Sequence, residues 1–202
     1  MRYASIRSMD ISNGEGVGIS LFVQGCHFHC KNCFNPETWD FNGGKEWTPE
    51  VEDKFIELAS RPYIKRISLL GGECLADENL DGILNLVNKI RLLMPEKTIW
   101  LYTGYTIITI MPYKLFALHP NIMSTNPTLV MSKNPSLLKE KELAYEIERK
   151  RSEIINKCDV VIDGRYIDSQ RDVSLKWRGS ANQRVIDVKK SLRENKIILY
   201  CD

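Results

Sequence analysis

The sequence of 202 residues has no long apolar run. No window approaches the roughly eighteen consecutive apolar residues that a membrane span needs. The stretch from Met1 to Asp10 alternates polar and apolar residues, so it has no apolar centre of the kind found in secretion signals. These absences argue against a membrane or secreted protein and predict a soluble protein of the cytoplasm.

Blocks of like charge are also missing. The 28 basic and 26 acidic residues are spread along the chain and leave a formal charge of +2. Without a basic tail or patch, neither nucleic acid nor a membrane surface is an expected partner. The sequence has no internal repeat or low-complexity segment, and 43% of its residues are apolar, enough for one substantial core. We therefore expect a single domain over residues 1–202.

Short apolar runs that end at glycine, or at an Asp-Gly pair, predict the strands of a sheet. Four such runs are Gly18 to Gln24, Arg66 to Leu70, Lys97 to Thr103 and Val160 to Ile162. Two further short strands are predicted near the end, over Gln183 to Val188 and Ile197 to Tyr200, the second at an edge.

Helical patterns separate these strands. Thr48 and Pro49 begin one helix, and apolar residues from Leu80 to Ile90 form the stripe of another. Strands that alternate with helices predict an α/β fold with a parallel sheet and right-handed crossovers. The segment from Ile107 to Lys157 reads as an insertion: a surface loop, then an amphipathic helix over Leu138 to Asn156 that packs on the outside.

The stretch GCHFHCKNCFNP places Cys26, Cys30 and Cys33 at the spacing C-x3-C-x2-C. Soft thiolates suit zinc or an iron-sulfur cluster. A closed structural zinc site takes four ligands, commonly as two separated pairs, and no second CxxC or HxxxH pair occurs. The remaining cysteines stand alone, at Cys74, Cys158 and Cys201. The three thiols therefore favour a four-iron, four-sulfur cluster with one iron left open.

Other interpretations of the cysteines remain open on the sequence. His27 or His29 could complete a Cys3His zinc site, although ligands adjacent in sequence strain a tetrahedral geometry. Three free buried thiols are another possibility. A different class of function would be a zinc-stabilised interaction module without catalysis, with Lys139 to Lys150 as its partner-binding helix.

A strand followed directly by this cysteine loop resembles the radical S-adenosylmethionine (SAM) superfamily. The resemblance implies a partial (β/α) barrel in which Cys26, Cys30 and Cys33 hold a 4Fe-4S cluster. It further implies that the amino and carboxylate groups of SAM bind the open iron.

Further SAM contacts are implied by the same resemblance. Gly71, Gly72 and Glu73 follow the second core strand and resemble the GGE motif that contacts the methionyl amino group. Asn32 stands where many members carry an aromatic residue near adenine and where the closest family often has glycine. The backbone from Asn32 through Cys33 to Phe34 is expected to read the adenine edge instead. Asn13-Gly14-Glu15-Gly16 could form a turn at the rim of the site.

Three longer stretches narrow the family: MDISNGEGVGISLFVQGCHFHCKNCFNPETWDF, the pair IWLYTGYT and VIDGRY, and LKWRGSANQRVIDV. Together they resemble the activating proteins of anaerobic (class III) ribonucleoside-triphosphate reductases, over Met1 to Thr106 and Asp159 to Val188. The chain departs from that pattern in NGEG for NGPG, in Phe34 for tyrosine and in a longer Ile107 to Lys157 segment.

This resemblance implies an oxidoreductase mechanism. An electron from the reduced cluster cleaves SAM into methionine and a 5'-deoxyadenosyl radical, which abstracts hydrogen from a glycine of the reductase catalytic subunit. An electron donor such as flavodoxin is implied, and no protein acid or base is expected. Other radical SAM enzymes, such as the activator of pyruvate formate-lyase, would share the cluster and are expected to lack WRGSANQR.

Residues near the end could border the same site. Trp177 to Ser180 and Asn182 to Arg184 combine an aromatic ring, planar cations and amides that suit docking of a backbone loop. The alternative is a solvated turn with Trp177 as a core residue. Asp163 and Arg165 could shape the opening of this site or form an ion pair with each other.

Overall fold

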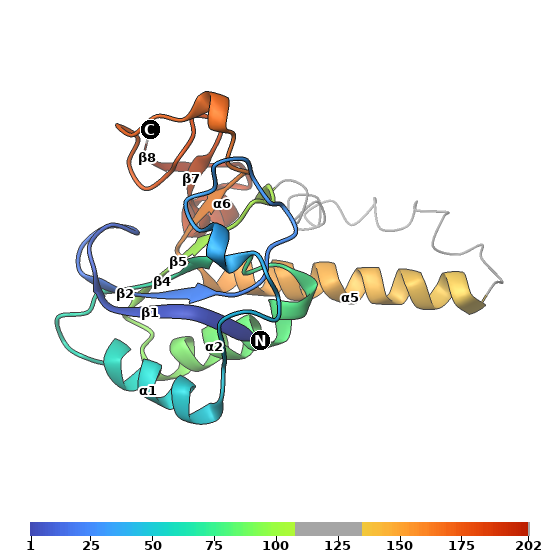
Figure 1. The fold of residues 1–202 in the computed structure, drawn as a ribbon, viewed down its shortest axis with the longest axis horizontal. Helices are drawn as coiled ribbons and strands as arrows, with labels where there is room; N and C mark the ends of the chain where they lie inside the picture. The colour runs from blue at the N-terminus through green and yellow to red at the C-terminus, as the bar shows by residue number, and fades with distance from the viewer. Residues whose placement is uncertain (108–134, 202) are drawn as a thin grey trace.

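The computed structural model describes residues 1–107 and 135–201. Within these residues an eight-stranded sheet forms the centre of the molecule (Figure 1). Its strand order is β3-β1-β2-β4-β5-β6-β7-β8. The strands are β1 (Arg2–Asp10), β2 (Gly18–Val23), β3 (Lys45–Glu46), β4 (Arg66–Gly71), β5 (Thr98–Tyr102), β6 (Val160–Asp163), β7 (Arg184–Asp187) and β8 (Leu199–Cys201). The α/β class predicted from the sequence is confirmed.

The four middle strands, β2, β4, β5 and β6, run parallel, as predicted. Their register aligns Leu21, Leu69, Leu101 and Val161 across the sheet. The outer strands pair antiparallel: β1 with β2, β3 with β1, β7 with β6 and β8 with β7. The predicted edge position of the last strand is therefore confirmed.

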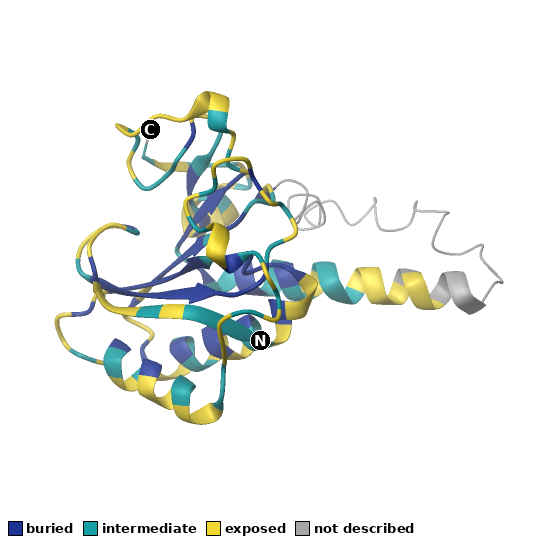
Figure 2. Cartoon of the chain, viewed as in Figure 1, coloured by how far each residue is buried: buried dark blue, intermediate teal, exposed yellow. Residues whose placement is uncertain are grey.

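Helices cover one face of this sheet. They are α1 (Pro49–Ala59), α2 (Leu80–Leu93), α5 (Pro135–Lys157) and α6 (Val188–Glu194). The hydroxyl oxygen of Thr48 accepts a hydrogen bond from the Val51 amide at 3.4 Å and caps α1. The covered face of the strands is buried, whereas the outer sides of the helices are exposed (Figure 2).

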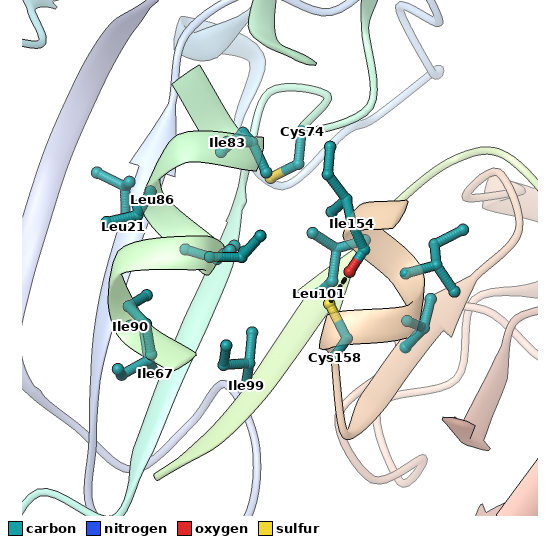
Figure 3. Packing of buried hydrophobic residues seen from close by; sticks show 14 of the residues in the cluster. Leu21, Ile67, Cys74, Ile83, Leu86, Ile90, Ile99, Leu101, Ile154 and Cys158 are labelled. Atoms are coloured by element: carbon teal, nitrogen blue, oxygen red, sulfur yellow. Dashed lines mark hydrogen bonds between the residues drawn. The ribbon is translucent and has the colours of Figure 1, made fainter. Parts of the chain in front are cut away.

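The apolar core lies between this face and the helices. Figure 3 shows Ile67, Ile99 and Leu101 of the strands packing against Ile83, Leu86 and Ile90 of α2 and Ile154 of α5. Because successive residues of a strand point to opposite faces, the alternate residues form the second face. That face carries Phe22, Leu70, Trp100 and Tyr102 near the ends of the parallel strands.

Helix α5 begins three residues before the predicted start and ends one residue after the predicted end. Its last turns are buried against the core through Ile154 and Ile155, which supports the predicted packing on the outside of the sheet. Its first turns project beyond the rest of the molecule (Figure 1). The loop predicted before it lies largely outside the described residues. None of the described helices is both long and apolar enough to cross a membrane.

Strands β1 and β3 and helix α6 were not predicted from the sequence. Strand β1 is largely half-buried or exposed and pairs with β2, and the polar-apolar alternation from Arg2 to Asp10 was its signal. Strand β3 has only two residues, both exposed. Helix α6 has seven residues, and its start was marked by Asp187, whose carboxylate accepts a hydrogen bond from the Lys190 amide.

Candidate metal and cofactor site

A cavity of about 550 Å³ opens beside the carboxyl ends of the parallel strands. Loops that follow β2, β4, β5 and β6 all contribute to its lining, as does the segment before β7. These loops bring Cys26, Cys30, Cys33, Gly71, Gly72, Glu73, Thr103, Gly104, Gly164, Trp177 and Arg178 to one space. Segments distant in the sequence therefore meet where ligands of α/β proteins usually bind.

The cysteine loop is held by backbone hydrogen bonds. The amides of Gly25 and Cys26 donate to the carbonyl oxygens of Thr38 and Trp39 at 2.8 and 3.1 Å. The Cys33 amide donates to the Cys30 carbonyl at 3.1 Å and closes a tight turn. All three cysteines are free thiols; Cys30 is buried, and Cys26 and Cys33 are half-buried. The loop thus exposes its sulfurs to the cavity while its backbone remains fixed.

The two histidines of the loop have other neighbours. His27 Nε2 lies 3.0 Å from a carboxylate oxygen of Glu78, and the His29 ring stacks on Trp39 with centroids 4.7 Å apart. Neither histidine lines the cavity. Among residues 1–107 and 135–201, no three His, Cys, Asp or Glu side chains converge closely enough to hold a single metal ion. The Cys3His zinc site considered from the sequence is therefore not formed.

The three thiols fit a cluster better than a single ion, because each thiolate of an iron-sulfur cluster binds its own iron. Burial raises the pKa of the Cys26 thiol to about 11, and nearby Glu73 adds to the shift. Metal ligands must be deprotonated, so a Cys26 thiolate needs a cation beside it. The three thiolate ligands and their burial therefore both suit an iron-sulfur cluster.

Positive charge surrounds the cavity. Its three phenylalanines, Phe22, Phe28 and Phe34, each have a guanidinium group near the ring. These groups belong to Arg7, Arg165 and Arg171, at 4.5, 5.9 and 5.7 Å from the ring centroids. The only carboxylate that lines the described cavity is that of Glu73. A cluster with three thiolates, or a ligand carboxylate, would be favoured by this field.

The Gly-Gly pair after β4 lies against the cysteine loop. A Cβ atom on Gly72 would come within 2.4 Å of the Gly25 carbonyl oxygen, and Gly71 has a φ of +108°, which other residues rarely adopt. The Glu73 amide donates to the same Gly25 carbonyl at 2.7 Å. The absence of side chains at Gly71 and Gly72 therefore lets the loop after β4 contact the loop after β2 directly.

Glu73 is buried, with 2% of its surface exposed. Its Oε1 accepts hydrogen bonds from the Leu75 amide and the Thr103 hydroxyl at 2.9 and 2.8 Å, and its Oε2 accepts one from the Gly104 amide at 2.8 Å. Burial raises the pKa of Glu73, although these donors and Arg151 oppose the shift. The carboxylate is thus held rigidly at the cavity wall, with capacity on Oε2 for a cationic donor.

A buried arginine supports the opposite rim and was not identified from the sequence. Arg66 is fully buried, and its guanidinium donates to the Asp10 carbonyl and the Ser68 hydroxyl at 2.6 and 2.8 Å. Ser68 in turn donates to the carbonyl of Asn13, which lines the cavity. The predicted rim position of the Asn13 turn is therefore confirmed for Asn13. An arginine at the start of an otherwise apolar strand was the signal.

The segment before β7 also reaches the site. Trp177, Arg178, Gly179 and Gln183 line the cavity, and the Trp177 ring packs edge-on against Trp100 with centroids 4.9 Å apart. Trp177 therefore serves both as a packing residue and as cavity lining.

The predicted alternative of an Asp163 and Arg165 ion pair is not formed. Asp163 instead pairs with Arg184. Arg165 donates to the Phe28 carbonyl at 2.7 Å, within the cysteine loop. Arg165 therefore helps to shape the mouth, whereas Asp163 fixes the end of β6.

Cys74 follows Glu73 but does not line the cavity. It is fully buried in the apolar core, as is Cys158 (Figure 3). Burial raises the pKa of the Cys74 thiol well above its ordinary value. Cys74 is therefore a packing residue and not a fourth ligand of the cysteine loop.

Comparison with known proteins agrees with this geometry. The family described as "4Fe-4S single cluster domain" matches residues 12–186 of the chain. The anaerobic ribonucleoside-triphosphate reductase-activating protein of Vibrio cholerae is 33% identical over 185 residues, which cover 91% of this chain and 96% of the relative. The chain belongs to this family of activating proteins.

Other members of the activating-protein family are similar at the same level. The protein of that name from Escherichia coli (strain K12) is 32% identical over 187 residues, covering 92% of this chain and 97% of the relative. The protein of that name from Enterobacteria phage T4 is 31% identical over 185 residues, covering 92% of this chain and 93% of the relative. The chain is therefore an activating enzyme that also matches the 4Fe-4S single cluster domain family.

Proposed function

We propose that this chain activates an anaerobic ribonucleoside-triphosphate reductase by radical SAM chemistry. The observation that carries the proposal is the meeting of three cysteines and the Gly71-Gly72-Glu73 turn at one cavity. Relatives that carry the name of such activating proteins, at about a third identity over nearly the whole chain, support it.

The cluster is bound by Cys26, Cys30 and Cys33. Their loop is closed by the hydrogen bond from the Cys33 amide to the Cys30 carbonyl, and all three cysteines line the cavity. With three protein ligands for four irons, one iron is left for SAM. Arg7 and Arg178, which line the cavity, offset the negative charge of the thiolates.

SAM is bound by the turn after β4 and by the cysteine loop. The Glu73 carboxylate accepts a hydrogen bond from the methionyl ammonium group, because its Oε2 has only one donor in the described structure. Gly71 and Gly72 allow close approach of the ligand to the backbone. The adenine edge is read by the backbone of Asn32, Cys33 and Phe34.

A cluster held by Cys26, Cys30 and Cys33 would supply the electron that cleaves SAM to methionine and a 5'-deoxyadenosyl radical, and this radical would take a hydrogen atom from a glycine of the reductase. The chain's own residues bind, orient and exclude water. Phe22, Leu70 and Tyr102 supply an apolar wall, and the Trp177 to Gly179 segment borders the opening where a glycine loop enters. A flavodoxin serves as the electron donor.

The proposed fold of the chain is a partial (β/α) barrel that forms one domain. Support comes from the four parallel strands, from the helices on their outer face and from the cavity on the inner face. The strands added antiparallel at each side would extend the barrel wall.

A partner exchange tests the proposal. The anaerobically reconstituted protein is incubated with SAM, a reductant and either the reductase or a pyruvate formate-lyase, and the glycyl radical is measured by electron paramagnetic resonance (EPR). We expect a doublet signal when the partner is the reductase and no signal when it is the formate-lyase. A signal with the formate-lyase and none with the reductase would overturn the choice of partner.

A further inference from the structure

One carboxylate links the cysteine loop to a segment more than a hundred residues later in the chain. Asn32 Nδ2 donates a hydrogen bond to Asp168 Oδ2 at 2.8 Å, and the Tyr166 hydroxyl donates to Asp168 Oδ1 at 2.9 Å. Asp168 thus binds Asn32 with one oxygen and Tyr166 with the other. Both donors hold the pKa of Asp168 below its ordinary value.

Asn32 occupies a position where the backbone conformation needs support. Its φ is +54°, in the left-handed region, and it lies within the turn that the Cys33 amide closes onto Cys30. This region is unfavourable for residues with a Cβ, and asparagine tolerates it better than most residues because its short polar side chain can hydrogen-bond to a partner. In the described structure that partner is Asp168.

The other neighbour of Cys33 is held by the same segment. The Phe34 ring packs edge-on against Tyr166 with centroids 5.3 Å apart. A Cβ atom on Gly179 would lie 2.6 Å from the Phe34 ring, so the ring also lies directly on the Gly179 backbone. Asp168 orients Tyr166, and Tyr166 contacts Phe34. Both residues that flank Cys33 are therefore fixed from outside the loop.

We propose that Asp168 is a positioning residue for Cys33. It keeps Asn32 in the left-handed conformation and Tyr166 against Phe34, and it thereby sets where the Cys33 sulfur faces the cavity. Lys31 and Arg171 are the cations near Asp168, and neither bonds its carboxylate directly. The role of Cys33 as an iron ligand rests on the proposed function, but the positioning of the loop does not.

The first test measures hydrogen-deuterium exchange by mass spectrometry on the metal-free full chain. In Asp168→Ala, we expect peptides that cover residues 26–35 to exchange about fivefold faster, because the hydrogen bond that supports Asn32 is lost and a typical hydrogen bond contributes about 1 kcal/mol. The Cys33 amide is the expected reporter. The matched control is Asp172→Ala, since Asp172 is exposed and, in the described structure, its carboxylate accepts hydrogen bonds only from Ser174 in its own turn. Equal exchange in the two variants would overturn the proposal.

A charge exchange provides a second, independent test. Asn32→Asp places two carboxylates opposite each other and should speed exchange of the loop. Adding Asp168→Asn to that variant restores one amide-carboxylate hydrogen bond, so exchange should return to within about twofold of the wild type. Failure of the second substitution to restore protection would contradict the proposed role of Asp168.

The reconstituted protein gives a spectroscopic readout. We expect the EPR spectrum of the reduced cluster to change shape in Asp168→Ala and to match the wild type in Asp172→Ala. A spectrum unchanged by Asp168→Ala would overturn the link to Cys33. If the wild type bound no 4Fe-4S cluster, the proposed function would fail, whereas the exchange measurements on metal-free protein would still decide whether Asp168 positions the loop.

Discussion

Gly72 lies directly against Gly25, so that the backbone of the turn after β4 touches the start of the cysteine loop. A Cβ atom on Gly72 would come within 2.4 Å of the Gly25 carbonyl oxygen, and a backbone atom cannot move aside as a flexible side chain can. This contact joins the two loops that carry the thiols and the Glu73 carboxylate. Their separation is therefore set by the smallest residue at each side.

Gly72→Ala should force these loops apart. We expect the free energy of unfolding to fall by about 1–3 kcal/mol, as for other overpacked sites, and SAM-dependent activity to fall more than about tenfold. Gly82→Ala is the matched control, because the atoms nearest to a Cβ there belong to the flexible side chain of Met1 and not to backbone. Urea unfolding and activity assays measure both effects; full activity in Gly72→Ala would contradict the importance of the contact.

Glu73→Gln keeps the size of the side chain and removes its charge. We predict that SAM binds about 10- to 100-fold more weakly, since a hydrogen bond to a charged group contributes about 1.5–3 kcal/mol. The iron content should stay at the wild-type level because Glu73 is not a proposed ligand. Equilibrium binding of SAM to the reconstituted protein tests this, and unchanged affinity would rule out the proposed ammonium contact.

Each of Cys26→Ser, Cys30→Ser and Cys33→Ser should lose most of the bound iron and the visible absorption of the cluster. Cys201→Ser is the control, because Cys201 is half-buried in β8 and does not line the cavity. Iron and acid-labile sulfide are measured after anaerobic reconstitution. Iron loss in the control, or iron retained in all three loop variants, would be inconsistent with this ligand set.

Asp159 gives a pH-dependent prediction away from the site. Burial, the largest single cause, tends to raise its pKa, but the combined effect of Lys189, Arg91 and the Ile99 amide holds the pKa below the ordinary value of 3.8. A carboxyl whose pKa is lower in the folded state stabilises the protein above the unfolded value. That stabilisation is lost as the pH falls through the folded value.

Asp159→Asn should therefore lower the free energy of unfolding by about 1–3 kcal/mol at pH 7. The difference between wild type and variant should shrink as the pH falls below 3.8, the ordinary value for the carboxyl. Urea unfolding at pH 7, 5 and 3 measures it. A difference that is constant over this range would show that the charge of Asp159 is not responsible.

The parallel strands and the cysteine loop could be predicted because their signals are local. Gly18 to Val23 is apolar throughout, and Cys26, Cys30 and Cys33 are contiguous in one loop. Strand β1 was harder to predict, because a half-exposed strand carries charged residues on its solvent-facing side and so lacks a continuous apolar run.

Contacts between distant residues could not be predicted from one sequence. Asn32 and Asp168 are polar residues in ordinary loops, and nothing near either residue indicates that the chain brings them together. The buried pair of Asp10 and Arg66 is similar: an arginine in an apolar strand signals a partner but does not identify it. Strand pairing in the folded sheet brings Asp10 beside Arg66 at the amino ends of β2 and β4. The loops after β2 and β6 bring Asn32 to Asp168 at the carboxyl ends.

The most direct test of the account is the EPR spectrum of the reduced, reconstituted protein with and without SAM. We expect a 4Fe-4S signal whose shape shifts when SAM is added, because the proposed ligands Cys26, Cys30 and Cys33 would leave one iron open to SAM. A colourless protein that binds zinc, or a cluster signal that SAM does not alter, would contradict it.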